Sequence, residues 1–141
     1  MKKILFVPNP ILRKKADLIK KITLKDIEIS KKMTDIMLKA PGVGLAANQI
    51  GILKQIITVN IPDEKKNKSK IYTLFNPRII KYSKNKISLE EGCLSLPKQY
   101  AEIERSEEIE LEYFNDKKEK IIQNINGFEA RVLQHEIDHL H

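Results

Sequence analysis

Residues 132–141, VLQHEIDHLH, contain a His-Glu-x-x-His pattern. On an α-helix, His135 and His139 are about 40° and one turn apart, so both imidazoles can bind one ion. Glu136 lies about 100° from His135, within reach of a water molecule on that ion without being a ligand. Two imidazoles and a carboxylate that accepts a proton are the parts of a metal-assisted hydrolase. The spacing therefore predicts a catalytic metal site, although three fixed positions also occur by chance.

A catalytic site of this kind needs a third protein ligand and one open position. The candidates are Asp138, His141 and Cys93. Asp138 is about 60° from His135 around the helix, which suits support of the site better than ligation. His141 faces away from the pair. Cys93 lies far off in the chain, and its simpler interpretation is a small buried hydrophobic residue. The residues alone leave the third ligand open.

The helix that carries the histidines has apolar residues on both sides. Phe128 and Val132 share the side of the histidines, and a second group occupies the opposite side: Leu133, Ile137 and Leu140. A helix with this pattern is typically buried. We therefore expect a helix from about Phe128, with the site inside the fold beside a partly apolar pocket.

The elements expected around this helix belong to the α+β class, with antiparallel β-sheets around it. A capping box of Thr23 and Asp26 predicts a helix that ends near Ala40. β-Branched and alternating patterns predict several strands, at 55–60, 71–77, 87–90 and 107–114, with one more at 120–123. The polar residues 61–70 are predicted to form a loop.

Composition limits the classes of protein to consider. A chain of 141 residues with 41% hydrophobic residues fits one domain, 1–141. The single cysteine excludes an internal disulfide, and no apolar run is long enough for a signal core or membrane span. We therefore expect a soluble, cytoplasmic protein. The net charge of +7 comes from scattered lysines without interleaved aromatic residues, which favours a solvated surface over a nucleic-acid site.

Three segments together resemble a known family. GVGLAANQ (42–49), EGCLSLP (91–97) and QHEIDHL (134–140) are similar to the signature motifs of peptide deformylases, in the same order and at similar spacing. NPILR (9–13) resembles the opening of that family, so the likeness covers essentially the whole chain. The resemblance implies an α+β fold with antiparallel sheets around the histidine helix.

The resemblance also implies roles for individual residues. The metal ligands would be Cys93, His135 and His139, and Glu136 would carry the proton. The side-chain amide of Gln49 and the backbone N–H of Leu94 would donate to the oxygen that develops negative charge. Further residues would support the site or line the substrate pocket: Glu91, Arg105 and Asp138 for support, and Val43, Gly44, Leu94, Phe128 and Val132 for the pocket.

The implied reaction is hydrolysis of the N-formyl group from the formyl-methionine of newly synthesised polypeptides, releasing formate. The resemblance also implies one bound divalent ion, Fe²⁺ in the cell, with Zn²⁺, Ni²⁺ or Co²⁺ in purified protein. The implied partners are nascent formyl-methionyl peptides and the ribosome near its exit tunnel, without DNA or membrane. The implied location is the cytoplasm of a bacterial-type cell, or of a host infected by a virus that encodes the protein.

Two features depart from the family pattern. Only Leu140 and His141 follow His139, the last implied ligand, so the resemblance is to a short member that lacks the usual C-terminal tail. Because the last turn of a helix leaves carbonyls without partners, we expect this end to depend on the metal. Tyr100 stands where some branches carry arginine, which affects peptide preference.

Two other classes remain open at this stage. A zinc metallopeptidase uses the same His-Glu-x-x-His logic, but it does not account for Gln49 or EGCLSLP. A basic RNA-binding module with a structural metal predicts salt-sensitive binding that does not depend on Glu136.

Overall fold

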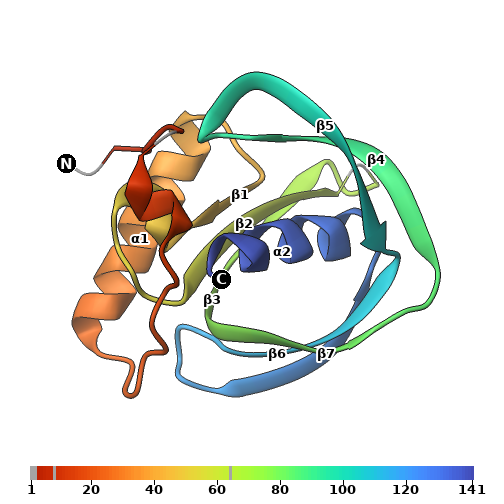
Figure 1. The fold of residues 1–141 in the computed structure, drawn as a ribbon. Coiled ribbons are helices and arrows are strands. Elements are labelled where there is room, and N and C mark those ends of the chain that lie inside the picture. The colour runs from red at the N-terminus through yellow and green to blue at the C-terminus, as the bar shows by residue number, and fades with distance from the viewer. Residues whose placement is uncertain (1–2, 8, 64) are drawn as a thin grey trace.

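Two antiparallel sheets surround the helix α2 (Gly127–His139), which crosses the middle of the molecule, and a second helix packs against the larger sheet (Figure 1). This computed structural model describes residues 3–7, 9–63 and 65–141. The elements before α2 run as follows: η1 (Pro10–Arg13), α1 (Leu24–Lys39), β1 (Gly44–Ala46), η2 (Ala47–Ile50), β2 (Ile56–Asp63), β3 (Lys68–Tyr82), β4 (Lys86–Cys93), β5 (Leu96–Ser106), β6 (Glu108–Phe114) and β7 (Lys120–Asn126). The expected α+β class is confirmed.

The larger sheet has the strand order β1-β2-β3-β6-β7, and β4 pairs with β5 as a separate two-stranded ribbon. All of these pairs are antiparallel. The predicted loop at 61–70 is wrong over most of its length, because β2 and β3 stay paired as far as Asp63 and Lys68. Polar residues at a hairpin end keep their backbone pairing while their side chains point into water, so polarity alone misplaced the turn.

Two strands have no counterpart in the predicted set. β1 has only three residues, all small or apolar and fully buried, so it carries no alternating pattern. The middle of β5 mixes charged and apolar residues, and most of its described side chains are exposed. A strand is predicted from the alternation of buried apolar and exposed polar residues. A ribbon that covers little core lacks a clear alternation, so its strands are harder to predict.

The predicted capping box opens α1. Thr23 Oγ1 accepts the Asp26 N–H, and Asp26 Oδ2 accepts the Thr23 N–H at 2.9 Å. The Asp26 carboxylate also receives the Lys54 ammonium at 2.7 Å, which ties the start of α1 to the segment before β2. Met33 and Met37 on the inner stripe are fully buried.

The two-sided burial predicted for α2 holds for Val132 on the histidine side, which is 5% exposed, but not for Phe128, which is 50% exposed at the start of the helix. Leu133 and Leu140 are fully buried and Ile137 is nearly so, all in a core cluster formed mainly with strands of the larger sheet. The other side of the helix bears the histidines. The fold therefore uses one helix both as the centre of the core and as the support of the site.

Protein groups satisfy the end of α2. The His139 carbonyl accepts the side-chain amide of Asn48, and the Leu140 carbonyl accepts the Ala16 N–H at 2.9 Å. The expectation that this end depends on a metal is therefore incomplete, since η2 and the N-terminal segment already hold it.

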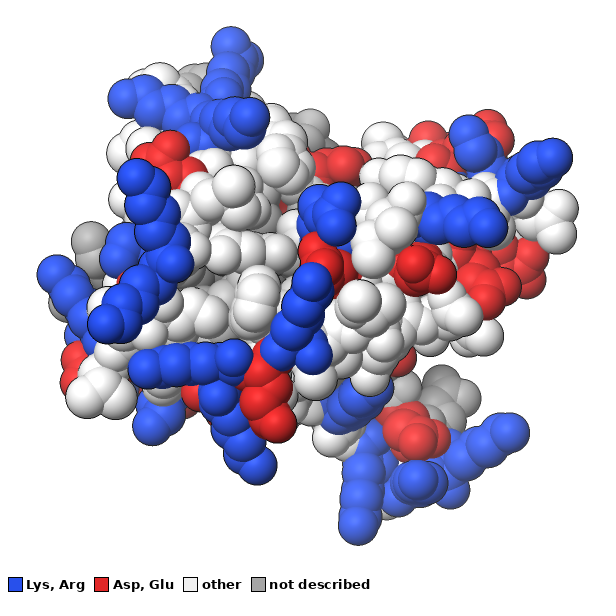
Figure 2. Space-filling model, turned by 90° about the horizontal axis from the view of Figure 1, so that it is seen from below, with Lys and Arg blue, Asp and Glu red and all other residues white. Residues whose placement is uncertain are grey.

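Neither helix is long and apolar enough to cross a membrane, among the residues the structure describes. Basic side chains spread over most of the face in Figure 2, with acidic side chains between them. This distribution matches the scattered lysines of the sequence.

Replacing Asp26 with Asn tests the start of α1. Burial raises the pKa of Asp26, but hydrogen bonds from Lys54 and Thr23 outweigh it and hold the pKa below its ordinary value. The folded state thus binds fewer protons than the unfolded state, and the stabilisation is present above the ordinary pKa and is lost as pH falls through the lowered one. We expect Asp26→Asn to lower the free energy of unfolding by about 1 kcal/mol at pH 7.

Urea unfolding at pH 7 and pH 3 measures this difference, which should shrink at the lower pH. Asp35→Asn, an exposed position on the same helix, serves as the control. An equal loss for Asp26→Asn at both pH values would contradict the assignment.

Candidate active site

Three potential metal ligands converge between α2 and the end of β4. Cys93 Sγ lies 3.3 Å from His139 Nε2, which lies 3.2 Å from His135 Nε2. The ligand atoms of all three residues lie within 4.8 Å of one another. Ligands about 2.0–2.3 Å from a common tetrahedral ion are separated by about 3.3–3.5 Å, so the spacing fits a single metal. Among the described residues, Asp138 and His141 are not part of this group.

A tight turn presents the Cys93 sulfur. The pairing of β4 with β5 shifts register between Gly92 and Cys93, and Cys93 then pairs with Leu96. Inside this turn the sulfur accepts backbone N–H groups from Ser95 and Leu96. Burial raises the pKa of the Cys93 thiol despite these donors. The free thiol is therefore protonated at neutral pH, and cation binding displaces its proton.

The histidine rings are held in a form suited to ligation. His135 Nδ1 lies 3.0 Å from Glu91 Oε1, which leaves Nε2 facing His139. Burial, followed by the neighbouring His135, lowers the pKa of His139 to about 4. The His139 ring is therefore neutral at pH 7 and keeps a lone pair for a metal. A carboxylate behind a histidine is a common support in metal sites.

The Glu91 carboxylate joins the ribbon to α2. Arg105 donates to both of its oxygens, at 3.1 and 3.2 Å, and Arg131 donates to Oε2. Burial raises the pKa of Glu91, but Arg105, His135 and Arg131 outweigh it and leave the pKa lowered. The side chain of Glu91 is only 7% exposed. Glu91 and Arg105 therefore form an enclosed ion pair and not a pair of surface charges.

Sequence reasoning missed two members of this region. Arg131 is buried and also donates to the carbonyls of Ile87 and Ile103, one on each strand of the ribbon. Gln134 pairs with both backbone groups of Ser106, as a neighbouring strand would. Arg131 could have been found from its position four residues before His135, which places both on one side of the helix. No sequence signal pointed to Gln134, because nothing in the sequence placed β5 beside it.

Asp138 supports the site from its rim. Its side chain is 66% exposed and pairs with Arg105, which in turn binds Glu91. The charge of Asp138 also opposes the lowering of the His139 pKa, and both interactions are consistent with the supporting position expected from the helix angles.

Glu136 is enclosed beside the ligands. Its Oε1 is buried without a hydrogen-bond partner in the described part of the chain. Burial raises the pKa of Glu136 to about 8, Glu91 adds to the rise and Arg105 opposes it. Gly44 makes room for this carboxylate, because a Cβ at that position would lie 2.6 Å from Glu136 Oε2. A side chain at position 44 would displace the carboxylate.

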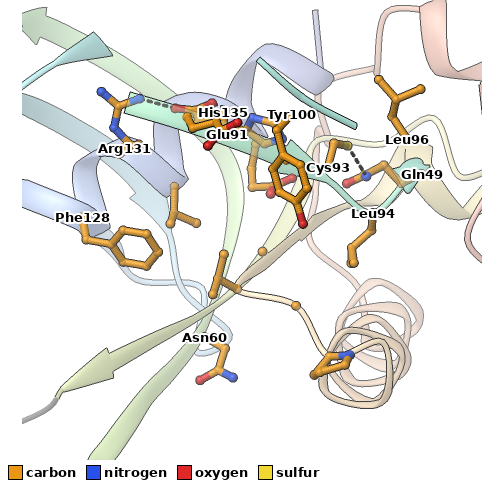
Figure 3. Close-up of a pocket in the computed structure, with 18 of the residues that line it drawn as sticks. Gln49, Asn60, Glu91, Cys93, Leu94, Leu96, Tyr100, Phe128, Arg131 and His135 are labelled. Carbon is orange, nitrogen blue, oxygen red and sulfur yellow. Dashed lines mark hydrogen bonds and ion pairs between the residues drawn. The ribbon is translucent and has the colours of Figure 1, made fainter. Parts of the chain in front are cut away.

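A cavity of about 670 Å³ opens onto this site. All five residues expected in the substrate pocket line it: Val43, Gly44, Leu94, Phe128 and Val132. Figure 3 shows Phe128 and Leu94 on opposite sides, with Tyr100 projecting between them. Gln49, Cys93, His135 and Glu136 also line the cavity, so polar groups converge on one part of a largely apolar wall. Tyr100, Leu96 and Asn60 are lining residues that the pocket prediction did not include.

The fold and this site define a metal-dependent hydrolase with an apolar substrate pocket. A family model described as Polypeptide deformylase matches residues 1–141, and the chain belongs to that family. The peptide deformylase of Agrobacterium fabrum (strain C58 / ATCC 33970) is 36% identical over 141 residues, which cover 99% of this chain and 82% of that protein.

Solved structures agree. A probable peptide deformylase from Synechococcus phage S-SSM7 has a TM-score of 0.93 at 34% identity, covering 99% of this chain and 94% of that one. The peptide deformylase of Ehrlichia chaffeensis in complex with actinonin has a TM-score of 0.93 at 34% identity, covering 99% and 83%. The activity is removal of the N-formyl group from formyl-methionine at the start of new polypeptides, releasing formate. This assignment decides against the metallopeptidase and the RNA-binding module.

Replacing Glu91 with Gln tests the junction between the ribbon and α2. The change leaves the buried Arg131 guanidinium without its counter-charge and removes one of the two carboxylates that pair with Arg105, so we expect the free energy of unfolding to fall by about 3 kcal/mol. Urea unfolding of the metal-free protein at pH 7 measures this loss.

Glu112→Gln is the matched control, because Glu112 also binds two cations, Arg78 and Lys120, whose side chains are 65% and 56% exposed. Its unfolding midpoint should barely move. Equal losses in the two variants would show that burial of the Glu91 network contributes nothing.

Proposed function

We propose that Cys93, His135 and His139 bind one divalent ion and leave a fourth position for water. The observation that carries this proposal is the convergence of their three ligand atoms within 4.8 Å. The unpartnered Oε1 of Glu136 and the cavity beside it support the proposal, since both leave room for a polar group. When bound, such an ion acts as a Lewis acid and makes water a nucleophile near neutral pH.

Glu136 carries the proton in this proposal. Its carboxylate accepts a proton from the water that attacks the formyl carbon. The same carboxyl group then gives that proton to the amide nitrogen as the carbon–nitrogen bond breaks. Formate and a free amino terminus leave, and Glu136 is again a carboxylate. Its raised pKa, about 8 in the metal-free protein, suits a group that must both accept and release a proton near pH 7.

Gln49 and Leu94 stabilise the developing negative charge. The Gln49 side chain is 1% exposed, and its amide nitrogen points toward Cys93 at the wall of the cavity (Figure 3). The backbone N–H of Leu94, in the turn after Cys93, is the second donor. Preorganised donors of this kind typically contribute about 3 kcal/mol each to the transition state. Val43, Phe128 and Val132 hold the methionine side chain against an apolar wall.

We propose Fe²⁺ as the metal in the cell, with Zn²⁺, Ni²⁺ or Co²⁺ able to replace it in purified protein. A ligand set of one thiolate and two imidazoles accepts all four ions. The thiolate makes an iron form sensitive to oxidation, so protein purified without oxygen should lose activity in air faster with Fe²⁺ than with Ni²⁺. Equal rates of loss would count against iron.

We place the reaction in the cytoplasm, on nascent chains near the ribosomal exit tunnel. The substrate is an N-terminus made by a ribosome, so an enzyme that acts on it meets it where nascent chains emerge. The bacterial and phage origins of the similar proteins support a bacterial-type cell or an infected host. Salt-sensitive co-sedimentation with ribosomes would test the association.

Two variants separate chemistry from metal binding. Glu136→Gln should bind metal normally and lose about 10²–10⁴-fold in kcat, because only the proton carrier is removed. Cys93→Ala should lose the metal itself. Formate release from a formyl-Met peptide and metal content by elemental analysis measure the two effects. A Glu136→Gln protein with full activity would exclude the mechanism.

A further inference from the structure

The Gln49 amide is held at both ends. Its Oε1 accepts the Ala46 N–H at 2.9 Å, and its Nε2 donates to Ser95 Oγ at 3.1 Å. These bonds fix which end of the amide is oxygen and which is nitrogen. The terminal torsion of glutamine is otherwise broad, so the orientation comes from these two partners and not from an intrinsic preference.

The serine occupies one of two N–H groups. A side-chain amide has two hydrogens on its nitrogen. The Ser95 hydroxyl takes one, and the other is directed at Cys93 Sγ at 3.5 Å, an ordinary distance for a hydrogen bond to sulfur. Because sulfur is a weak acceptor, a substrate oxygen in the cavity can replace it. The second N–H is therefore the one available to a substrate oxygen.

Ser95 is itself firmly placed and does not touch the cavity. It is 2% exposed, its N–H donates to Cys93 Sγ, and its carbonyl accepts the Val7 N–H at 3.0 Å. Its side chain is absent from the cavity lining, whereas Gln49 is part of it. Any effect of the hydroxyl on substrate therefore passes through Gln49.

We propose that Ser95 is a positioning residue, whose hydroxyl aims the second N–H of Gln49 at the oxygen of the reacting carbonyl. This inference rests on the proposed role of Gln49 as a donor. Loss of the hydroxyl frees the amide to rotate, and the donor then spends only part of its time aligned. Because alignment matters in the transition state, kcat falls while KM and metal binding are unchanged.

A double-mutant cycle of Ser95→Ala and Gln49→Ala tests the proposal. With formyl-Met peptide and metal-loaded protein, we expect Gln49→Ala to lower kcat by about 10²–10³-fold. Ser95→Ala alone should lower kcat by about 10-fold, a fraction of the loss of the whole donor, with KM within about twofold. In the Gln49→Ala background, Ser95→Ala should have no further effect. The affinity for Co²⁺ and the absorption spectrum of the Co²⁺ form should match the wild type in Ser95→Ala.

Ser30→Ala is the matched control, since Ser30 is equally buried and its hydroxyl bonds only within α1, to the Ile27 carbonyl. It should leave kcat unchanged. If Ser95→Ala does not fold, Ser95→Cys keeps the size of the side chain with a weaker acceptor and should give a smaller kcat loss. In either variant, ¹⁵N NMR should show faster exchange of the Gln49 side-chain amide.

The possible outcomes distinguish the role of Ser95 from the role of Gln49. Additive losses of kcat in the cycle, an unchanged kcat in Ser95→Ala, or a change in its Co²⁺ spectrum would overturn the role of Ser95. A normal kcat in Gln49→Ala would instead overturn the proposed role of Gln49 as a donor, whatever Ser95 does.

Discussion

One buried carboxylate, that of Glu91, sets the geometry of the whole site. The sulfur of Cys93 comes from the β4–β5 ribbon and the imidazoles come from α2, so the distance between them depends on how the ribbon docks. Apolar packing does little of this docking, because Ile87 and Leu89 on the ribbon remain 43% and 51% exposed. Glu91 lies between Arg105 on the ribbon and Arg131 on the helix, and it also orients His135. The alignment of the ligands is therefore an electrostatic property more than a hydrophobic one.

The burial of α2 has two consequences of opposite kind. On one side Leu133 and its neighbours stabilise the fold by leaving water. On the other side the same enclosure raises the pKa of Glu136 and lowers that of His139. The lowered pKa keeps the His139 ring neutral at pH 7, and the raised pKa brings Glu136 close to the pH at which it must accept and then release a proton. The desolvation that accompanies burial of α2 therefore also shifts the pKa values of the groups on its histidine side.

The parts of the molecule that could be predicted are those set by local chain geometry. The capping box of α1, the helical spacing of His135 and His139, and the two-sided burial of α2 follow from a few neighbouring residues. Other contacts could not be derived in the same way. Arg131 binds Glu91 and Ser95 binds Gln49 only because the tertiary fold brings α2, η2, β4 and β5 together. The motif resemblance supplied Cys93 and Gln49, which no periodicity would have joined to the histidines. The length of the β2–β3 hairpin was missed because backbone pairing persists where side chains are polar.

The position of α2 along the chain bears on the order of assembly. In the part of the chain that the structure describes, all seven strands precede α2, and the Ala16–Leu140 bond joins segments that are far apart in the sequence. During synthesis the strands therefore emerge from the ribosome before α2, the helix that they surround in the folded protein. A folding intermediate with its sheets formed would expose the faces that α2 later covers, and such contacts between distant segments are slow to form. With the proposed ligand set, the cation therefore binds after α2 has docked, since His135 and His139 are synthesised after Cys93.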